Sequence, residues 1–162
     1  MREKLWNLLD KARFDYCYLE EYRSWLMFCR FVAKSVEGMA LAVLAGGLAG
    51  LFDAGPAVLG IALMLGAIAV VCEQSMLTEK LAALAFALPE MSLQLRKLHG
   101  DWLSVNSVYS YEEKAIADIF AHHMEKLETI SERYLDRLNV PASKRLAARA
   151  SAIAALYASK LS

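Results

Sequence analysis

The sequence lacks the residue patterns that mark most enzyme and metal sites. Its three cysteines form no Cys-x-x-Cys pair, so we expect neither a disulfide framework nor a thiolate zinc site, and a reducing, cytosol-facing environment suits them. The sequence contains no glycine-rich phosphate loop, nucleophile elbow or paired-acid motif. We therefore predict that the chain is not an enzyme and binds no cofactor.

The sequence also has no excess of positive or negative charge, and it does not begin with an apolar segment. The 18 basic and 18 acidic residues cancel, so global charge indicates no partner. The chain opens with Met-Arg-Glu-Lys-Leu-Trp, which is the start of a charged amphipathic helix and does not resemble a signal peptide. We expect the first membrane span to act as its own insertion signal.

A long apolar stretch, residues 38–72, dominates the rest of the chain. It is interrupted once, by Asp53-Ala54-Gly55-Pro56, and neither arm contains a charged residue. The second arm reaches the length of about 18 residues that marks a membrane span. The first arm reaches it when its helix is continued back through Phe31 and Val32, since Lys34 can extend its amine toward the membrane surface.

The alternative is a soluble bundle with a buried hairpin, and glycine content argues against it. Glycine costs a soluble helix about 1 kcal/mol relative to alanine, yet seven of the eight glycines lie in this stretch. Gly38, Ala42, Gly46 and Gly50 recur every fourth residue, a pattern of small residues that lets helices approach closely in lipid. Ala62 and Gly66 form a shorter version in the second arm.

Hydrophobic periodicity predicts helices in the remaining segments. Residues 3–35 form one long helix that runs directly into the first arm, and residues 73–88 continue the second arm. Pro89 is expected to kink or break that helix and Gly100 to end it. Ser110 and Glu113 resemble a capping box for a helix from 111 to about 139, and a last helix covers about 142–161.

The predicted fold is therefore all-α: a two-span transmembrane helical hairpin with a long N-terminal helix and C-terminal cytoplasmic helices. The regions are 1–37, 38–72 and 73–162. Lys and Arg flank the hairpin but are missing from its turn. By the positive-inside rule, both termini should be cytoplasmic in the inner membrane.

Charged residues at the ends of the hairpin are candidates for lining a pore. Glu37 and Glu73 would lie near the inner mouth and Asp53 near the outer one, with Gly46 and Gly50 along the wall. Equally, such acids mark the membrane interface. A single hairpin encloses no pore, so a channel would require a homo-oligomer, for example a tetramer.

The C-terminal end is basic, because no Asp or Glu follows Asp136. Arg137, Lys144, Arg145 and Arg149 are candidates for binding a nucleotide or oligonucleotide through its phosphates. Binding to anionic lipid headgroups and a simple solvated face are the alternatives.

His122 and His123, with Asp118 and Glu125 nearby, form the only pattern suggestive of a metal. The spacing is not that of a known zinc motif, and His123 falls on the apolar face of its helix. We predict a packed histidine and no metal.

The whole layout resembles the SLATT family of bacterial two-transmembrane effectors. The likeness covers roughly residues 19–138. It is carried by Tyr22-Arg23-Ser24-Trp25 leading into residues 31–52 and by the turn at 53–56. It is also carried by the span to Cys72, followed by Glu73 and Lys80, and by the later helix 111–134. The resemblance implies a pore-forming effector in anti-phage defence, paired with a nucleotidyltransferase or a nucleotide-sensing domain. The expected partners are therefore the bilayer, further copies of the chain, a nucleotide signal and the enzyme that makes it. A non-conducting membrane anchor and a soluble helical interaction module are the alternatives.

Overall fold

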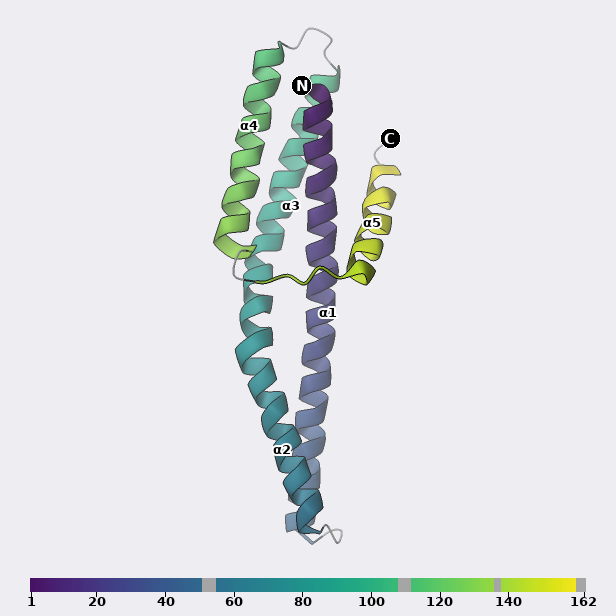
Figure 1. The fold of residues 1–162 in the computed structure, drawn as a ribbon, viewed down its shortest axis with the longest axis vertical. Helices are drawn as coiled ribbons and strands as arrows, with labels where there is room; N and C mark the ends of the chain where they lie inside the picture. Colours follow the sequence, from purple (N-terminus) through teal and green to yellow (C-terminus); the bar gives the residue numbers. More distant parts are fainter. Residues whose placement is uncertain (51–54, 108–111, 136–137, 160–162) are drawn as a thin grey trace. The chain divides into compact units, whose positions relative to one another are not determined.

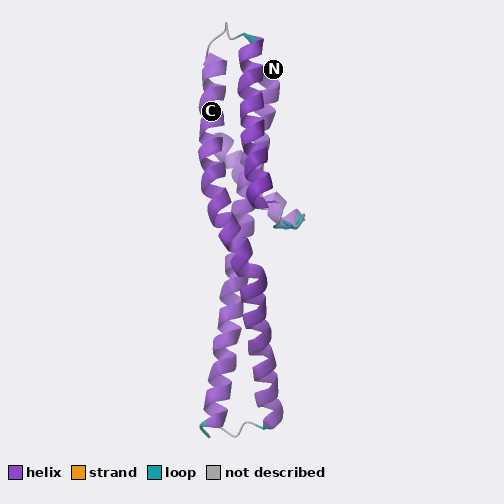
Figure 2. Ribbon diagram, turned by 90° about the vertical axis from the view of Figure 1, so that its left-hand side faces the viewer, coloured by secondary structure: helices purple, strands orange, loops and turns teal. Residues whose placement is uncertain are grey.

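All regular structure in the described part of the chain is helical. The computed structural model describes residues 1–50, 55–107, 112–135 and 138–159. The elements are, in chain order, α1 (Arg2–Leu48), α2 (Pro56–Cys72), the π-helical turn η1 (Glu73–Leu77), α3 (Thr78–Ser107), α4 (Glu113–Ile130), the π-helical turn η2 (Ser131–Leu135) and α5 (Lys144–Ser159) (Figures 1 and 2). The predicted all-α class is confirmed.

The chain divides into two compact units, each described here by itself. Unit 1 combines residues 1–23 with 83–162, and unit 2 is residues 24–82. The helix α1 contributes to both units because it continues unbroken from Arg2 to Leu48. The predicted entry of the N-terminal helix into the first apolar arm, with no break between them, is therefore confirmed.

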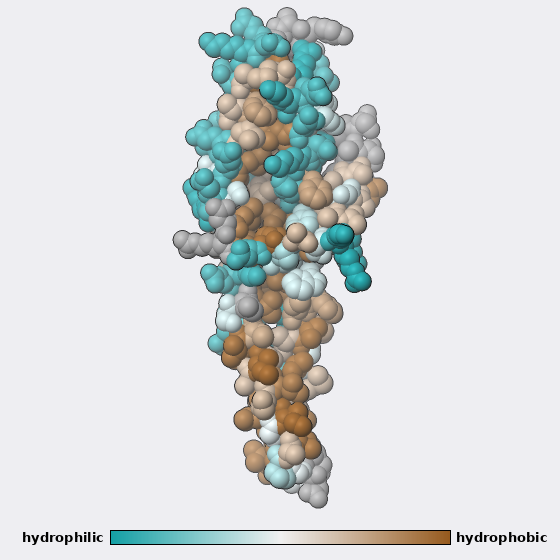
Figure 3. All heavy atoms as spheres, in the orientation of Figure 1, coloured by the Kyte–Doolittle hydropathy of each residue, from teal (hydrophilic) through white to brown (hydrophobic). Residues whose placement is uncertain are grey.

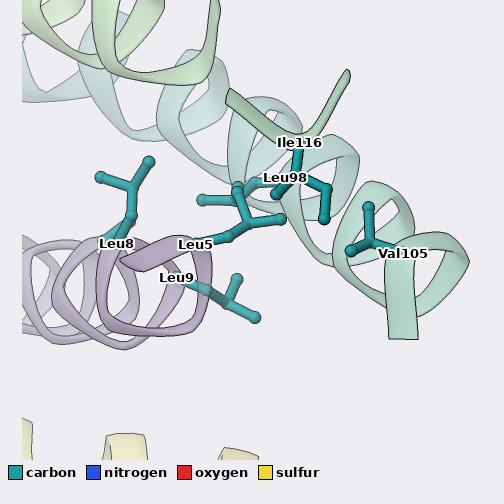
Figure 4. Packing of buried hydrophobic residues seen from close by; sticks show 7 residues of the cluster. Leu5, Leu8, Leu9, Leu98, Val105 and Ile116 are labelled. Carbon is teal, nitrogen blue, oxygen red and sulfur yellow. The ribbon is translucent and has the colours of Figure 1, made fainter. Parts of the chain in front are cut away.

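The core of unit 1 lies where α1, α3 and α4 meet. Figure 4 shows Leu5 of α1 beside Leu98 of α3 and Ile116 of α4. The cluster consists of Leu5, Leu8, Leu9, Ala12, Leu98, Val105 and Ile116. Leu5, Leu9 and Ala12 are spaced by four and three residues in the sequence, which predicts that they share one face of α1. Ile116 lies seven residues before His123 and therefore on the same apolar face of α4. The periodicity of these helices thus identified their buried faces.

The predicted end of α3 at Gly100 is wrong, because the helix continues to Ser107. Ending at Gly100 would remove Val105 and Trp102 from the core, where Val105 is 1% exposed and Trp102 packs against the cluster. The free energy gained by burying these two side chains exceeds the cost of about 1 kcal/mol for one glycine inside a helix. Pro89 was expected to kink or break the helix; it lies inside α3, so the break does not occur.

The segment before α5 is held to α1 by one side chain. The Tyr18 hydroxyl donates a hydrogen bond to the Pro141 carbonyl and accepts one from the Ser143 amide at 3.0 Å. Ser143 in turn caps α5, since its hydroxyl accepts a hydrogen bond from the Leu146 amide at 3.5 Å. Asn139 adopts a left-handed conformation with φ 42°, which asparagine tolerates better than most residues. Ser110, the first residue of the predicted capping box, lies outside the described residues.

Leu98→Ala should destabilise the protein by about 2–5 kcal/mol, because it leaves a cavity in this core. Leu98 is 0% exposed, whereas Leu93 on the same helix is 56% exposed. Leu93→Ala is therefore the matched control and should change stability by less than about 0.5 kcal/mol. Denaturant unfolding of the detergent-purified full chain measures both. Equal effects from the two variants would contradict the assignment of the core.

Candidate functional site

The two apolar arms lie side by side in unit 2 (Figures 1 and 2). Their contact is made by small residues: a Cβ atom added to Gly66 would lie 3.1 Å from the Cβ atom of Ala40. Ala40, Ala62 and Ala69 are buried. The close approach of the arms therefore depends on small side chains on both helices.

Most other side chains of these arms are apolar and exposed. Figure 3 shows hydrophobic residues covering the surface of the C-terminal part of α1 and of α2. Large exposed side chains on the arms and the turns before them are Met27, Phe28, Phe31, Val32, Met39, Leu41, Leu48, Val58, Ile61, Leu63, Met64, Leu65, Ile68 and Val71. A surface of this kind on a protein marks contact with a membrane or another protein.

Both helical runs are long and apolar enough to cross a membrane. In the most apolar 18-residue window of α1, only 11% of the window is buried. In the corresponding window of the helical run from Pro56 to Ser107, the buried share is 17%. A core helix of a soluble protein would be mostly buried instead. Within this chain, both apolar windows are therefore mostly exposed.

The predicted stripe of small residues on α1 has an exposed part and a buried part. Gly38 and Ala42 are exposed, on the side of α1 opposite Ala40, and a Cβ atom added to Gly38 would meet nothing within 4 Å. Gly46 is buried, whereas Gly50 is exposed. The stripe therefore leaves an open, small-residue surface around Gly38 and Ala42.

A compact charge cluster lies at the end of the arms opposite their connecting turn. The Glu73 carboxylate, 8% exposed, accepts hydrogen bonds from Arg30 Nε at 3.1 Å and from Lys34 Nζ at 2.6 Å. Lys34 Nζ also lies 2.9 Å from Glu37 Oε2. Two cations and two carboxylates thus form a neutral group. It ties α1 to η1, where the Thr78 hydroxyl also donates to the Glu73 carbonyl at 2.9 Å.

This pairing bears directly on the predicted pore-lining residues. Both Glu37 and Glu73 are engaged with cations of the same protomer, so neither presents a free carboxylate in this structure. Sequence reasoning identified the two acids and the flanking cations separately but did not pair them. Asp53, the third predicted acid, lies outside the described residues.

The predicted ligand-binding cations are spread over α5. Lys144 lines a cavity in unit 1, Arg145 is exposed, and Arg149 Nη1 lies 3.5 Å from Glu21 Oε2 of α1. Arg137 lies outside the described residues. Arg145 and Arg149 lie one turn apart on the same face of α5, whereas Lys144 lines the cavity.

The cavity beside Lys144 has a volume of about 700 Å³ and is mostly apolar. Its charged lining residues are Lys11, Asp15, Glu128 and Lys144, so its formal charge is balanced. Burial raises the pKa of the Asp15 carboxyl, and nearby Lys11 lowers it in part. A cavity with this lining suits an apolar or zwitterionic molecule better than a polyanion.

His123 is buried and hydrogen-bonded at both ring nitrogens. Nδ1 lies 2.7 Å from Gln94 Nε2, and Nε2 lies 2.8 Å from Asp101 Oδ2. The prediction of a packed histidine is confirmed, although its two partners on α3 were not predicted. Among the described residues, no group of three or more His, Cys, Asp or Glu is placed to hold a metal ion.

No family model, curated protein or solved structure matches the chain.

Gly66→Leu should separate the arms and destabilise unit 2 by about 1–3 kcal/mol, because the added side chain would overlap Ala40. Gly60→Leu is the control, since a Cβ atom at Gly60 meets nothing within 4 Å. Thermal unfolding in detergent, followed by helical circular dichroism, compares the two variants. A Gly66→Leu protein as stable as Gly60→Leu would mean that the arms do not pack through this point.

Asp15→Asn should raise the melting temperature at about pH 7. Because burial raises the folded-state pKa of Asp15, the folded state binds the proton more tightly than the unfolded chain. Wild-type stability therefore falls as pH rises from about 4, the ordinary value, through the raised one. The advantage of the variant should shrink as the pH falls through the raised value and should be lost below about pH 4. Asp118→Asn, at an exposed position of α4, serves as control. A gain that does not depend on pH would contradict this origin.

Proposed function

We propose that residues 38–72 form a transmembrane hairpin in the bacterial inner membrane, with both termini in the cytoplasm. The observation that carries this proposal is the exposure of the apolar side chains on both arms. From Arg30 to Leu48, α1 rises about 27 Å, which is close to the thickness of the hydrocarbon core of about 30 Å. The ion pairs of Glu73 would then lie at the cytoplasmic interface.

Within this membrane, the proposed activity is that of a pore-forming effector of anti-phage defence. A homo-oligomer would open a channel when a nucleotide or oligonucleotide made by a partner nucleotidyltransferase binds. Two things support this: the resemblance to SLATT effectors, and the open small-residue surface at Gly38 and Ala42, which suits close association of helices between protomers. Opening would permeabilise the infected cell.

One observation favours a second function, that of a non-conducting anchor which recruits a partner through its cytoplasmic helices. Glu37 and Glu73 are neutralised by Lys34 and Arg30, so the cluster offers no net charge to attract ions. A channel would have to rearrange these pairs or select ions elsewhere. An anchor requires neither.

Ion flux from liposomes separates the two functions. The full chain, reconstituted into liposomes, should release potassium after addition of a cyclic nucleotide or short oligonucleotide. Ala42→Leu should abolish this flux and reduce the oligomer measured in detergent, because the larger side chain fills the small-residue surface. Ala67→Leu places the same side chain at an exposed position of α2 and should retain both.

Other outcomes decide against the channel or against both functions. Inserted wild-type protein that releases no ions with any of these ligands would leave the anchor as the function. Recovery of the chain in the aqueous fraction without detergent would reject both membrane proposals.

A further inference from the structure

A small cleft in unit 1, between α1 and α3, is lined by cations and lacks a lining carboxylate. Its volume is about 300 Å³, and its lining residues are Arg13, Tyr16, Cys17, Ser92, Leu95, Arg96 and His99. The larger cavity beside Lys144 differs, because acids and bases are balanced there. Of these two cavities, the cleft is the one whose lining carries unbalanced positive charge.

Arg13 is the central group of the cleft. It is only 5% exposed, and it takes part in none of the ion pairs seen among the described residues. Its guanidinium lies over the Trp6 ring, 5.6 Å from the ring centroid. Burial lowers the pKa of Arg13, and Asp10 one turn earlier raises it in part. A buried cation without a carboxylate partner is costly unless an anion completes it.

Aromatic stacking positions the cation and its neighbour His99. Trp6 packs on Trp102 with ring centroids 4.7 Å apart, and His99 stacks on the same Trp102 at 6.4 Å and 12°. Burial, followed by the charge of Arg13, lowers the pKa of His99. A neutral His99 retains one N–H donor. The stacking fixes the side chains while it leaves guanidinium and imidazole donors for a ligand.

We propose that this cleft binds a phosphate group. Arg13 and Arg96 would donate charge-assisted hydrogen bonds to the phosphate oxygens, and His99, Tyr16 and Ser92 supply further polar atoms around it. The volume suits one phosphate or pyrophosphate group with a small attached part. The group could belong to a soluble nucleotide or to a phospholipid headgroup. Binding here goes beyond the proposed channel, since an anchor could use the same site.

The test is calorimetric titration of the detergent-purified full chain with inorganic pyrophosphate. Wild-type protein should bind it saturably. Arg96→Gln, at an exposed position, should weaken binding by roughly tenfold or more through loss of a charge-assisted hydrogen bond. Arg13→Lys keeps the positive charge but loses the bidentate hydrogen bonding of the guanidinium, so it should also weaken pyrophosphate binding. Arg145→Gln removes an exposed cation of α5 and should bind like wild type.

Tryptophan fluorescence gives a second readout that locates the ligand. In a Trp25→Phe background, the remaining emission comes from Trp6 and Trp102, which lie beside the cleft, so pyrophosphate should shift it with the same affinity. Absence of saturable binding to wild type would overturn the proposal. So would an Arg96→Gln protein that binds like wild type, or an Arg145→Gln protein that loses binding equally.

Bilayer discs then distinguish the two sources of phosphate. Discs of phosphatidylcholine alone should leave the pyrophosphate affinity as in detergent. If phosphatidylglycerol in the disc competes with pyrophosphate in wild type but not in Arg96→Gln, the natural ligand is a lipid headgroup. If it does not compete, the ligand is a soluble phosphate compound. Failure of ion flux with intact pyrophosphate binding would reject the channel and leave this site standing.

Discussion

The apolar surface of the two arms is the constraint on which the rest of unit 2 depends. Helices satisfy their own backbone hydrogen bonds, so an apolar medium can cover these arms without further polar partners. Four charged side chains next to the arms, Arg30, Lys34, Glu37 and Glu73, form one neutral group. Removing Glu73 would leave Arg30 and Lys34 without their shared partner, and the group would then carry a net positive charge next to the apolar turns.

The sequence predicted the helices well wherever periodicity and composition were the deciding forces. The long α1, the apolar α2 and the buried face of α4 were each readable from local spacing. Prediction failed at Gly100, because the helix there is maintained by Trp102 and Val105 packing against α1 and α4. A glycine in the local sequence carries no information about contacts with distant helices. The prediction at Gly100 failed because tertiary packing outweighed the low helix propensity of glycine.

The residues of the charge cluster around Glu73 could be predicted from the sequence, but the ion pairs between them could not. Glu73 and its flanking cations were visible as charges at the ends of an apolar run, yet their contacts join positions about 40 residues apart. Arg13 had an even weaker signal, because it follows directly after Ala12 on a face that otherwise reads as apolar. The local sign of a buried cation such as Arg13 is a charged residue next to an apolar stripe. Its role becomes clear only in the structure, where Trp6 and His99 lie beside Arg13.

The attachment of α5 has a consequence for local stability. Its start is held by the paired hydrogen bonds of Tyr18, and the ion pair of Arg149 with Glu21 adds an exposed contact. Apart from Ala150, which is 0% exposed, the described side chains of this helix are partly or fully accessible. Release of α5 should therefore cost less free energy than unfolding of the core formed by α1, α3 and α4. Its fraying would uncover the cavity beside Lys144 while the folded core persists.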